Sequence, residues 1–143
     1  PGRFLTANAG ALLTVVLHRK KRGKQEFLIL DAGMNDLLRP ALYGAHHQLF
    51  PLETQKAGAR KITYDVVGPV CESTDCFERG AKLPATLQSG SRIAILSAGA
   101  YGSSMASQYN SRTRPAEILV EGSSFRIIRD RETSEDLVRG EYL

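Results

Sequence analysis

Short apolar segments rich in β-branched residues recur along this chain, and glycine-containing turns separate them. Strands are predicted over residues 11–18, 25–31, 61–67, 91–96, 117–120 and 125–129, with a weaker candidate over 46–52. Segments of this kind favour strands because β-branched side chains pack well on a pleated surface. About seven short strands, with a turn roughly every ten residues, predict a mainly β fold: a small, closed or nearly closed β-barrel or sandwich with short helices.

Two hairpins follow from the residues between these strands. The basic run 19–24 separates the first two strands, and such a run is typical of a solvent-exposed hairpin end. Residues 121–124, with the sequence Glu-Gly-Ser-Ser, join the last two strands in the same way. Gly68 and Pro69 end the strand over 61–67, because this dipeptide marks a turn.

Helical segments are expected to be few and short. Residues 36–39 fit one or two turns at most, because Pro40 disfavours the helical conformation of the residue before it. Thr133 and Asp136 have the spacing of a capping box and predict a final short helix that ends at Gly140. The sequence contains no βαβ pattern, internal repeat or low-complexity linker.

The composition fits one domain with one hydrophobic core, since the chain has 143 residues of which 42% are hydrophobic and 24% charged. The longest apolar run, residues 9–17, is much shorter than the roughly 20 residues that cross a bilayer. No secretory signal is recognisable, because no apolar core and cleavage site follow Arg3. We therefore expect a cytoplasmic protein without a membrane segment. Pro1 lacks a preceding initiator Met, so we also expect a piece of a longer chain.

The net charge of +4 and the isoelectric point near 9.3 raise the question of an anionic partner. The one dense basic run is the predicted hairpin end at 19–24. Aromatic residues make up 7% of the chain and Trp is absent, so few side chains could stack on bases. We therefore expect no nucleic-acid binding, although a basic β-barrel binding module remains the alternative from another functional class.

Cys71 and Cys76 are too few for a disulfide framework. Together with His46 and His47 they could form a zinc site, but the Cys-x4-Cys spacing is looser than in most zinc knuckles. Adjacent histidines in a strand would also point to opposite faces of the sheet. We therefore expect no metal site.

The loops are the segments where functional residues are expected, because a rigid scaffold commonly carries its functional residues there. Cys71 closely follows the turn at Gly68 and Pro69, and Glu72 comes directly after it. A thiol beside a carboxylate could donate a proton, since the carboxylate favours the neutral thiol. The alternative is that Cys71 is simply a small buried side chain, because free cysteines are more commonly buried than exposed.

Arg39 and Tyr43 would share a helical face if the turn stays helical, because they are four residues apart. A guanidinium and a phenol placed in this way can bind a carboxylate, the guanidinium through two parallel hydrogen bonds. Arg3 directly follows Gly2, whose backbone can approach a ligand closely. Tyr101 lies between glycine-containing turns and is free to lean over a site. The alternative roles are structural: an arginine paired with an Asp, and tyrosines that are half-buried or cover the surface.

Taken together, these segments resemble one family, the diaminopimelate decarboxylases, which are pyridoxal-phosphate-dependent enzymes of fold type III. The matching blocks are Pro1-Gly2-Arg3 with residues 7–10, residues 31–43, residues 68–75, residues 99–102 and residues 109–112. The blocks occur in the order of the family and span almost the whole chain, so the resemblance is specific. The segment 77–82 is expected to be a loop whose length varies within the family.

This resemblance implies that residues 1–143 are the C-terminal β-domain of a two-domain enzyme that is similar to alanine racemase and ornithine decarboxylase. The N-terminal (β/α)8 barrel, which carries the lysine that anchors pyridoxal 5'-phosphate, is missing from the chain. The family converts meso-2,6-diaminopimelate into L-lysine and CO2 in the last step of lysine biosynthesis, as a homodimer with active sites at the interface. The resemblance therefore implies an inactive fragment, whose partners are the barrel domain and a second subunit. It also implies an open sheet edge, because the family's β-domain recruits a strand from the N-terminus of the full protein.

The resemblance assigns chemistry to the block around Cys71. Cys71 is the implied proton donor, contributed across the dimer interface to the partner's site. Glu72 is the implied ligand of the substrate's distal ammonium group, and Asp75 has a supporting role only. Within the family, arginine, ornithine or carboxynorspermidine stay open as alternative substrates, because close relatives share parts of these blocks.

The remaining assignments concern the distal carboxylate of the substrate and the cofactor. By the same resemblance, Arg3, Arg39 and Tyr43 bind the carboxylate. Tyr101 contacts both cofactor and substrate. The Pro1-Gly2-Arg3 segment lies near the cofactor phosphate.

Overall fold

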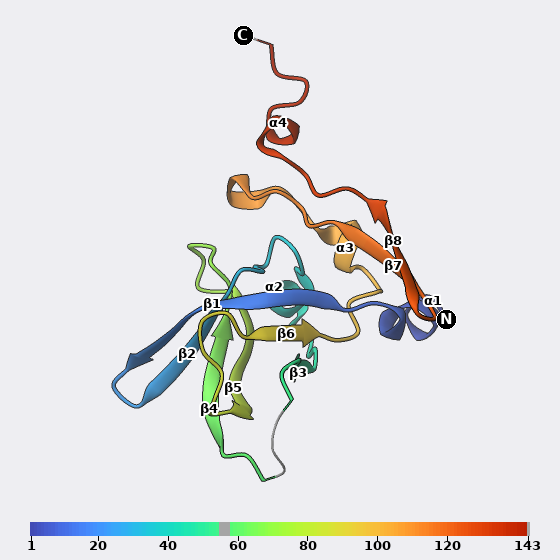
Figure 1. The fold of residues 1–143 in the computed structure, drawn as a ribbon. Helices are drawn as coiled ribbons and strands as arrows, with labels where there is room; N and C mark the ends of the chain where they lie inside the picture. The colour runs from blue at the N-terminus through green and yellow to red at the C-terminus, as the bar shows by residue number, and fades with distance from the viewer. Residues whose placement is uncertain (55–57, 143) are drawn as a thin grey trace.

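The computed structural model describes residues 1–54 and 58–142 and has a mainly β fold built around a nearly closed six-stranded barrel (Figure 1). The barrel strands are β1 (Leu12–Arg22), β2 (Gln25–Leu30), β3 (Leu49–Pro51), β4 (Lys61–Val67), β5 (Cys76–Pro84) and β6 (Arg92–Ile95). Strands β7 (Glu117–Glu121) and β8 (Ser124–Arg129) form a separate hairpin. The helices are α1 (Gly2–Thr6), α2 (Arg39–Tyr43), α3 (Gly102–Met105) and α4 (Ser134–Leu137), with 3-10 turns η1 (Ala7–Ala9) and η2 (Tyr109–Ser111). The predicted fold class is confirmed.

The six barrel strands form one sheet in the order β3-β6-β1-β2-β4-β5. Neighbours are antiparallel except β2 and β4, which run parallel. Strand β1 serves both halves of the barrel, because Leu12 to Val15 pair with β6 and the residues from Val16 onward pair with β2. A register shift between Val16 and His18 marks a bulge at this change of partner, and bulges bend a strand.

The barrel encloses one hydrophobic core. Its largest fully buried apolar side chains are Tyr64, Leu28, Leu30, Leu37, Leu87, Ile93, Ile95, Val16 and Val66. In β4, the buried Tyr64 and Val66 alternate with less buried residues, as expected for a strand with one face on a core. The Tyr64 hydroxyl donates a hydrogen bond to the carbonyl oxygen of Pro84 at 3.3 Å, so the one polar atom of this side chain is paired.

The predicted strands are confirmed, and β1 is longer than the sequence analysis expects. Of the basic run 19–24, residues 19–22 continue β1 and pair with β2. Only Gly23 and Lys24 form the turn, and Gly23 has a φ of +59°, which glycine adopts without strain. The basic side chains are exposed, as predicted for a hairpin end.

The prediction of a variable loop over 77–82 is wrong, because these residues belong to β5. The register between β4 and β5 shifts beside Asp65, so β5 bulges there. Gly80 lies at this bulge with a φ of +72°, and its N–H donates to Asp65 Oδ1 at 2.9 Å. Phe77 and Ala81 still face the core. The bulge breaks the period-two alternation of buried residues, which removes the pattern by which a strand is recognised.

Helix α2 differs from the prediction at its start. The sequence predicts a helical turn that ends at Arg39, before Pro40, whereas α2 begins at Arg39 and runs to Tyr43. Pro40 fits because the first turn of a helix has N–H groups without helical partners, so the missing donor costs little. Gly44 ends the helix in the left-handed conformation.

The capping box of the last helix is confirmed. The Thr133 backbone N–H donates to Asp136 Oδ2 at 2.8 Å, and the reciprocal bond to the Thr133 side chain is also present. Helix α4 ends at Leu137 rather than at Gly140, so it is shorter than predicted. None of the helices in the described ranges is long and apolar enough to cross a membrane.

Glu132 attaches the C-terminal segment to the loop before β7. Its carboxylate accepts hydrogen bonds from the backbone N–H of Arg114 at 2.8 Å and from Arg114 Nε at 2.7 Å. Gln108 Nε2 donates to the same carboxylate at 3.2 Å. The hydrogen bonds from Arg114 are the main cause that lowers the pKa of Glu132 to about 2.

The predicted second hairpin is confirmed as β7 and β8, which pair in a two-stranded sheet of their own (Figure 1). Ser103 in α3 donates to Glu117 Oε1 at 2.5 Å, and Arg129 forms an ion pair with Glu117 at 3.1 Å. The bond from Ser103 ties the hairpin to α3, and the ion pair joins β8 to β7. One face of the hairpin carries four exposed apolar side chains: Ile118, Val120, Phe125 and Ile127.

Candidate functional site

Asp75 anchors the loop between β4 and β5, which carries two of the predicted site residues, Cys71 and Glu72. The Asp75 side chain is buried, and its two oxygens accept hydrogen bonds from the backbone N–H groups of Met34 and Val70, both at 2.7 Å. A buried N–H left without an acceptor would cost roughly 1–3 kcal/mol. The loop is therefore fixed at its base, while Cys71 and Glu72 are exposed.

Gly68 makes room for the Asp75 carboxylate. A Cβ atom on Gly68 would lie 2.3 Å from Asp75 Oδ2, and the Gly68 N–H donates to the Asp75 carbonyl oxygen at 3.0 Å. Burial raises the pKa of Asp75, although the hydrogen bonds from Val70 and Met34 and the charge of Arg112 act in the opposite direction. The close packing of Gly68 on Asp75 therefore fixes where the loop leaves β4.

Glu72 contacts a residue that the sequence analysis does not select, Tyr109 in η2. The Tyr109 hydroxyl donates a hydrogen bond to Glu72 Oε1 at 2.5 Å. This hydrogen bond is the largest cause of a raised pKa for Tyr109, and Cys71 makes a smaller contribution in the same direction. Cys71, Glu72 and Tyr109 therefore form one exposed group at the surface.

A second group of predicted residues forms where α2 meets the turn before α3. Arg39 Cζ lies 5.8 Å from the ring centre of Tyr101, which is within range of a cation–π contact. Tyr43 follows Arg39 by four residues in α2, so the two lie on the same helix as predicted. Both rings are largely exposed, Tyr101 at 51% and Tyr43 at 66%. The structure thus brings Arg39 and Tyr101 together, with Tyr43 one turn away.

Tyr101 has a backbone conformation in the left-handed region, with a φ of +67°. A bulky residue seldom adopts this conformation, which costs of order 1–2 kcal/mol. Its neighbours Ala100 and Gly102 are buried, and its carbonyl oxygen accepts a hydrogen bond from the Met105 N–H at 3.1 Å. The surrounding structure therefore holds an exposed ring on a strained backbone, which is a common arrangement at functional sites.

Asn35 connects the two groups. It is 1% exposed, and its backbone carbonyl oxygen accepts a hydrogen bond from the Ser107 N–H at 2.9 Å. Its side-chain Oδ1 accepts a hydrogen bond from Arg112 Nε at 3.0 Å. Met34, the residue before it, binds the Asp75 anchor, and Arg39 follows four residues later. One short segment therefore positions both groups.

The Pro1-Gly2-Arg3 segment is the third part of the predicted site. It begins α1, a helix that the sequence analysis does not predict and in which every residue is exposed. The Gly99 N–H donates to the Ala7 carbonyl oxygen at 3.1 Å, and a Cβ on Gly99 would lie 2.1 Å from the Thr6 carbonyl oxygen. The N-terminal segment thus packs against the turn that leads to Tyr101. In the described part of the chain, no hydrogen bond or ion pair joins Pro1-Gly2-Arg3 to the other predicted site residues.

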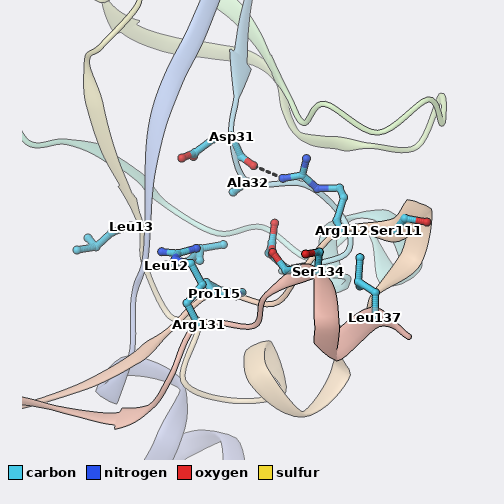
Figure 2. A pocket seen from close by; sticks show the side chains of 12 residues that line it. Leu12, Leu13, Asp31, Ala32, Ser111, Arg112, Pro115, Arg131, Ser134 and Leu137 are labelled. Atoms are coloured by element: carbon cyan, nitrogen blue, oxygen red, sulfur yellow. Dashed lines mark hydrogen bonds between the residues drawn. The ribbon is translucent and has the colours of Figure 1, made fainter. Parts of the chain in front are cut away.

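A pocket of about 470 Å³ lies elsewhere, where the start of β1 meets segments 111–115 and 131–137 (Figure 2). Arg112 lines it, and its guanidinium donates to the Asp31 carbonyl oxygen at 2.5 Å (Figure 2). None of the predicted site residues lines this pocket. They lie on the outer surface instead, where a ligand would contact them from one side.

The cysteines and histidines are not grouped as metal ligands. In residues 1–54 and 58–142, no three His, Cys, Asp or Glu side chains come together in a way that could hold a metal ion. Cys71 and Cys76 are free thiols. His47 is buried with Nδ1 3.0 Å from the Leu96 carbonyl oxygen, whereas His46 is exposed.

The barrel with its exposed loops places the chain in a known protein family. Residues 4–99 match the family model described as the pyridoxal-dependent decarboxylase, C-terminal sheet domain. The chain belongs to this family. It is similar to the diaminopimelate decarboxylase of Helicobacter pylori, with 52% identity over 139 residues that cover 97% of this chain and 34% of that protein.

Two solved structures of diaminopimelate decarboxylases, each in complex with L-lysine, share the fold. The Helicobacter pylori structure has a TM-score of 0.88 and 50% identity, and the match covers 97% of this chain and 33% of that one. The structure from M. jannaschii has a TM-score of 0.93 and 39% identity, and the match covers 100% of this chain and 32% of that one. The chain therefore spans about a third of the length of the relatives it matches.

Proposed function

We propose that this chain is the C-terminal domain of an enzyme that converts meso-2,6-diaminopimelate into L-lysine and CO2, and that it supplies part of active sites that lie between two subunits. The main support is structural: Cys71 with Glu72, and Arg39 with Tyr101, form two exposed groups attached to the one segment that contains Asn35. The substrate class follows relatives that are named diaminopimelate decarboxylases and are 46–52% identical to this chain. Exposed groups of this kind need a second surface to enclose a substrate.

The distal end of diaminopimelate carries both a carboxylate and an ammonium group. The planar guanidinium of Arg39 can bind the carboxylate through two hydrogen bonds, and Tyr43 and Arg3 can add further donors. Glu72 has the charge to bind the ammonium. A substrate that lacks either group would leave a charged side chain of the enzyme unpaired, which disfavours its binding.

Cys71 is the proposed proton donor to the carbon atom from which CO2 leaves. Its thiol is exposed in a loop that Asp75 fixes at the base, so it can reach a substrate held mainly by another surface. When bound, the family's cofactor, pyridoxal phosphate, would supply an electron sink for the pair left when the carboxylate departs. The S–H bond of Cys71 then breaks as the new C–H bond forms, in the active site of a second subunit.

The described residues fit one side of a cofactor site, and the family resemblance assigns the lysine that anchors the cofactor aldehyde to the barrel domain. The described lysines are exposed, on β1, β4, β5 or the turn after β1: Lys20, Lys21, Lys24, Lys61 and Lys82. Lys56 lies outside the described residues. Tyr101 presents an exposed ring beside the Arg39 guanidinium, which suits contact with a group that is both aromatic and anionic. Tyr101 is therefore a proposed cofactor contact, together with Pro1-Gly2-Arg3 near the phosphate.

The exposed face of the β7–β8 hairpin supports a partner domain or subunit. Its side chains are Ile118, 53% exposed, Val120, 68%, Phe125, 75%, and Ile127, 60%. A contiguous apolar face of this kind commonly marks an interaction surface. We therefore propose the barrel domain of the same enzyme and a second, identical subunit as partners, without which the chain is inactive.

An activity assay of the full-length protein that contains this domain tests the proposal. We expect it to release CO2 and L-lysine from meso-diaminopimelate, while residues 1–143 alone show no turnover. Arginine, ornithine and carboxynorspermidine are the alternative substrates within the family. A larger kcat/KM for any of these would contradict the assigned substrate, and turnover by the isolated domain would contradict the one-sided site.

A further inference from the structure

Tyr109 contacts Glu72, although none of the roles assigned above includes it. We propose that Tyr109 is a positioning residue: its hydroxyl holds the Glu72 carboxylate in place and thereby sets the selectivity for a substrate with a distal ammonium group. This inference rests on the proposed function, because it takes Glu72 as the ligand of that ammonium.

The segment that carries Tyr109 is attached at both ends to the segment before α2. At one end the Ser107 N–H donates to the Asn35 carbonyl oxygen at 2.9 Å. At the other end Arg112 donates to Asn35 Oδ1 at 3.0 Å and to the Asp31 carbonyl oxygen at 2.5 Å. Because Asn35 is almost fully buried, these attachments do not depend on an exposed side chain that could swing away. The backbone of Tyr109 therefore has a fixed position.

The turn after Tyr109 has an unusual backbone. Asn110 and Ser111 have φ values of +61° and +55°, so two consecutive residues other than glycine lie in the left-handed region. Such residues persist there only where the surrounding contacts outweigh the strain. The paired attachment to Asn35 supplies these contacts, and the Tyr109 hydroxyl reaches Glu72 from the residue just before this turn.

On the other side of the contact, Glu72 is exposed and its loop is fixed only at the base by Asp75. Among the described residues, Tyr109 is the one side chain hydrogen-bonded to the Glu72 carboxylate, and it uses Oε1. This leaves Oε2 to accept a hydrogen bond from an ammonium group. Without Tyr109, the Glu72 side chain would lose conformational freedom when the ammonium group binds, and this loss of entropy would weaken the binding of the ammonium group.

Competitive inhibition of the full-length enzyme tests the inference without requiring a second substrate. L-Lysine, the proposed product, keeps the distal ammonium group, and 6-aminohexanoate is the same molecule without it. In Tyr109→Phe we expect the Ki of L-lysine to rise roughly tenfold, as for the loss of a hydrogen bond to a charged group. The Ki of 6-aminohexanoate should stay the same, and KM for diaminopimelate should rise with little change in kcat. Tyr142→Phe, at a tyrosine that is 96% exposed, is the matched control and should change none of these values.

Glu72→Gln separates this inference from the proposed function. If Tyr109 acts only through Glu72, adding Tyr109→Phe to Glu72→Gln should have no further effect on either Ki. If Glu72→Gln removes the preference for L-lysine while Tyr109→Phe leaves it intact, the positioning role is overturned and the proposed function stands. If neither variant changes the preference, the role of Glu72 in the proposed function fails, and the inference fails with it.

Discussion

Replacing Cys71 with alanine in the full-length enzyme is expected to lower kcat by roughly 10²–10⁴-fold, the usual contribution of a positioned general acid. The KM for diaminopimelate should change little, because the thiol is assigned to proton transfer and not to substrate binding. The loop itself should keep its conformation, since Asp75 fixes it through the backbone N–H groups of Met34 and Val70 and not through the Cys71 side chain. Steady-state measurement of CO2 release gives both constants.

Cys76→Ala is the matched control for this prediction. Cys76 is the other free cysteine, it lies in β5, and it is partly buried, which raises its pKa. Its removal should leave kcat near the value of the parent enzyme. A Cys71→Ala variant with an unchanged kcat would remove the proton-donor role, whereas an equal loss in both variants would indicate damage to the fold.

Replacing Arg39 with alanine is expected to raise KM for diaminopimelate by roughly 10- to 150-fold, because hydrogen bonds to charged groups contribute about 1.5–3 kcal/mol. The change removes the proposed ligand of the distal carboxylate and also the cation that lies over the Tyr101 ring. The effect on kcat should be smaller. Arg39→Lys keeps the charge but cannot form two parallel hydrogen bonds to a carboxylate, so it should recover only part of the loss.

Arg22→Ala provides the control for the loss of one positive charge. Arg22 is exposed at the end of β1, in the hairpin that lies far from α3 in Figure 1. This variant should keep the KM of the parent enzyme. A KM near the parent value in Arg39→Ala would show that Arg39 does not contact the substrate.

The fold could be predicted from local patterns wherever those patterns are regular. The strands around Leu28, Tyr64 and Ile93 alternate or are continuously apolar, and the structure confirms them. β5 could not be predicted in this way, because the bulge at Gly80 interrupts the alternation of buried and exposed side chains along the strand. The start of α2 differs from the prediction because Pro40 lies in the first turn of the helix and does not end one.

The candidate site could be predicted only in part, for a different reason. Cys71 and Glu72 stand in a loop and Arg39 begins a short helix, and all three have recognisable chemistry, so sequence alone suggests them. Asn35 and Tyr109 act through contacts between segments far apart in the chain, such as the hydrogen bond from Arg112 to Asn35. No local pattern reports such a contact. Both residues belong to segments that resemble the family, but the resemblance alone does not say which residues they contact.

A crystal structure of the full-length enzyme with pyridoxal phosphate and L-lysine bound tests most directly whether this domain contacts the substrate. We predict that Glu72 lies within hydrogen-bond distance, about 2.7–3.2 Å, of the α-amino group of lysine. The lysine carboxylate should contact Arg39, and Cys71 Sγ of the second subunit should face the ε-carbon, from which CO2 has left. Lysine bound in the pocket at the start of β1, or away from these three side chains, would contradict the account.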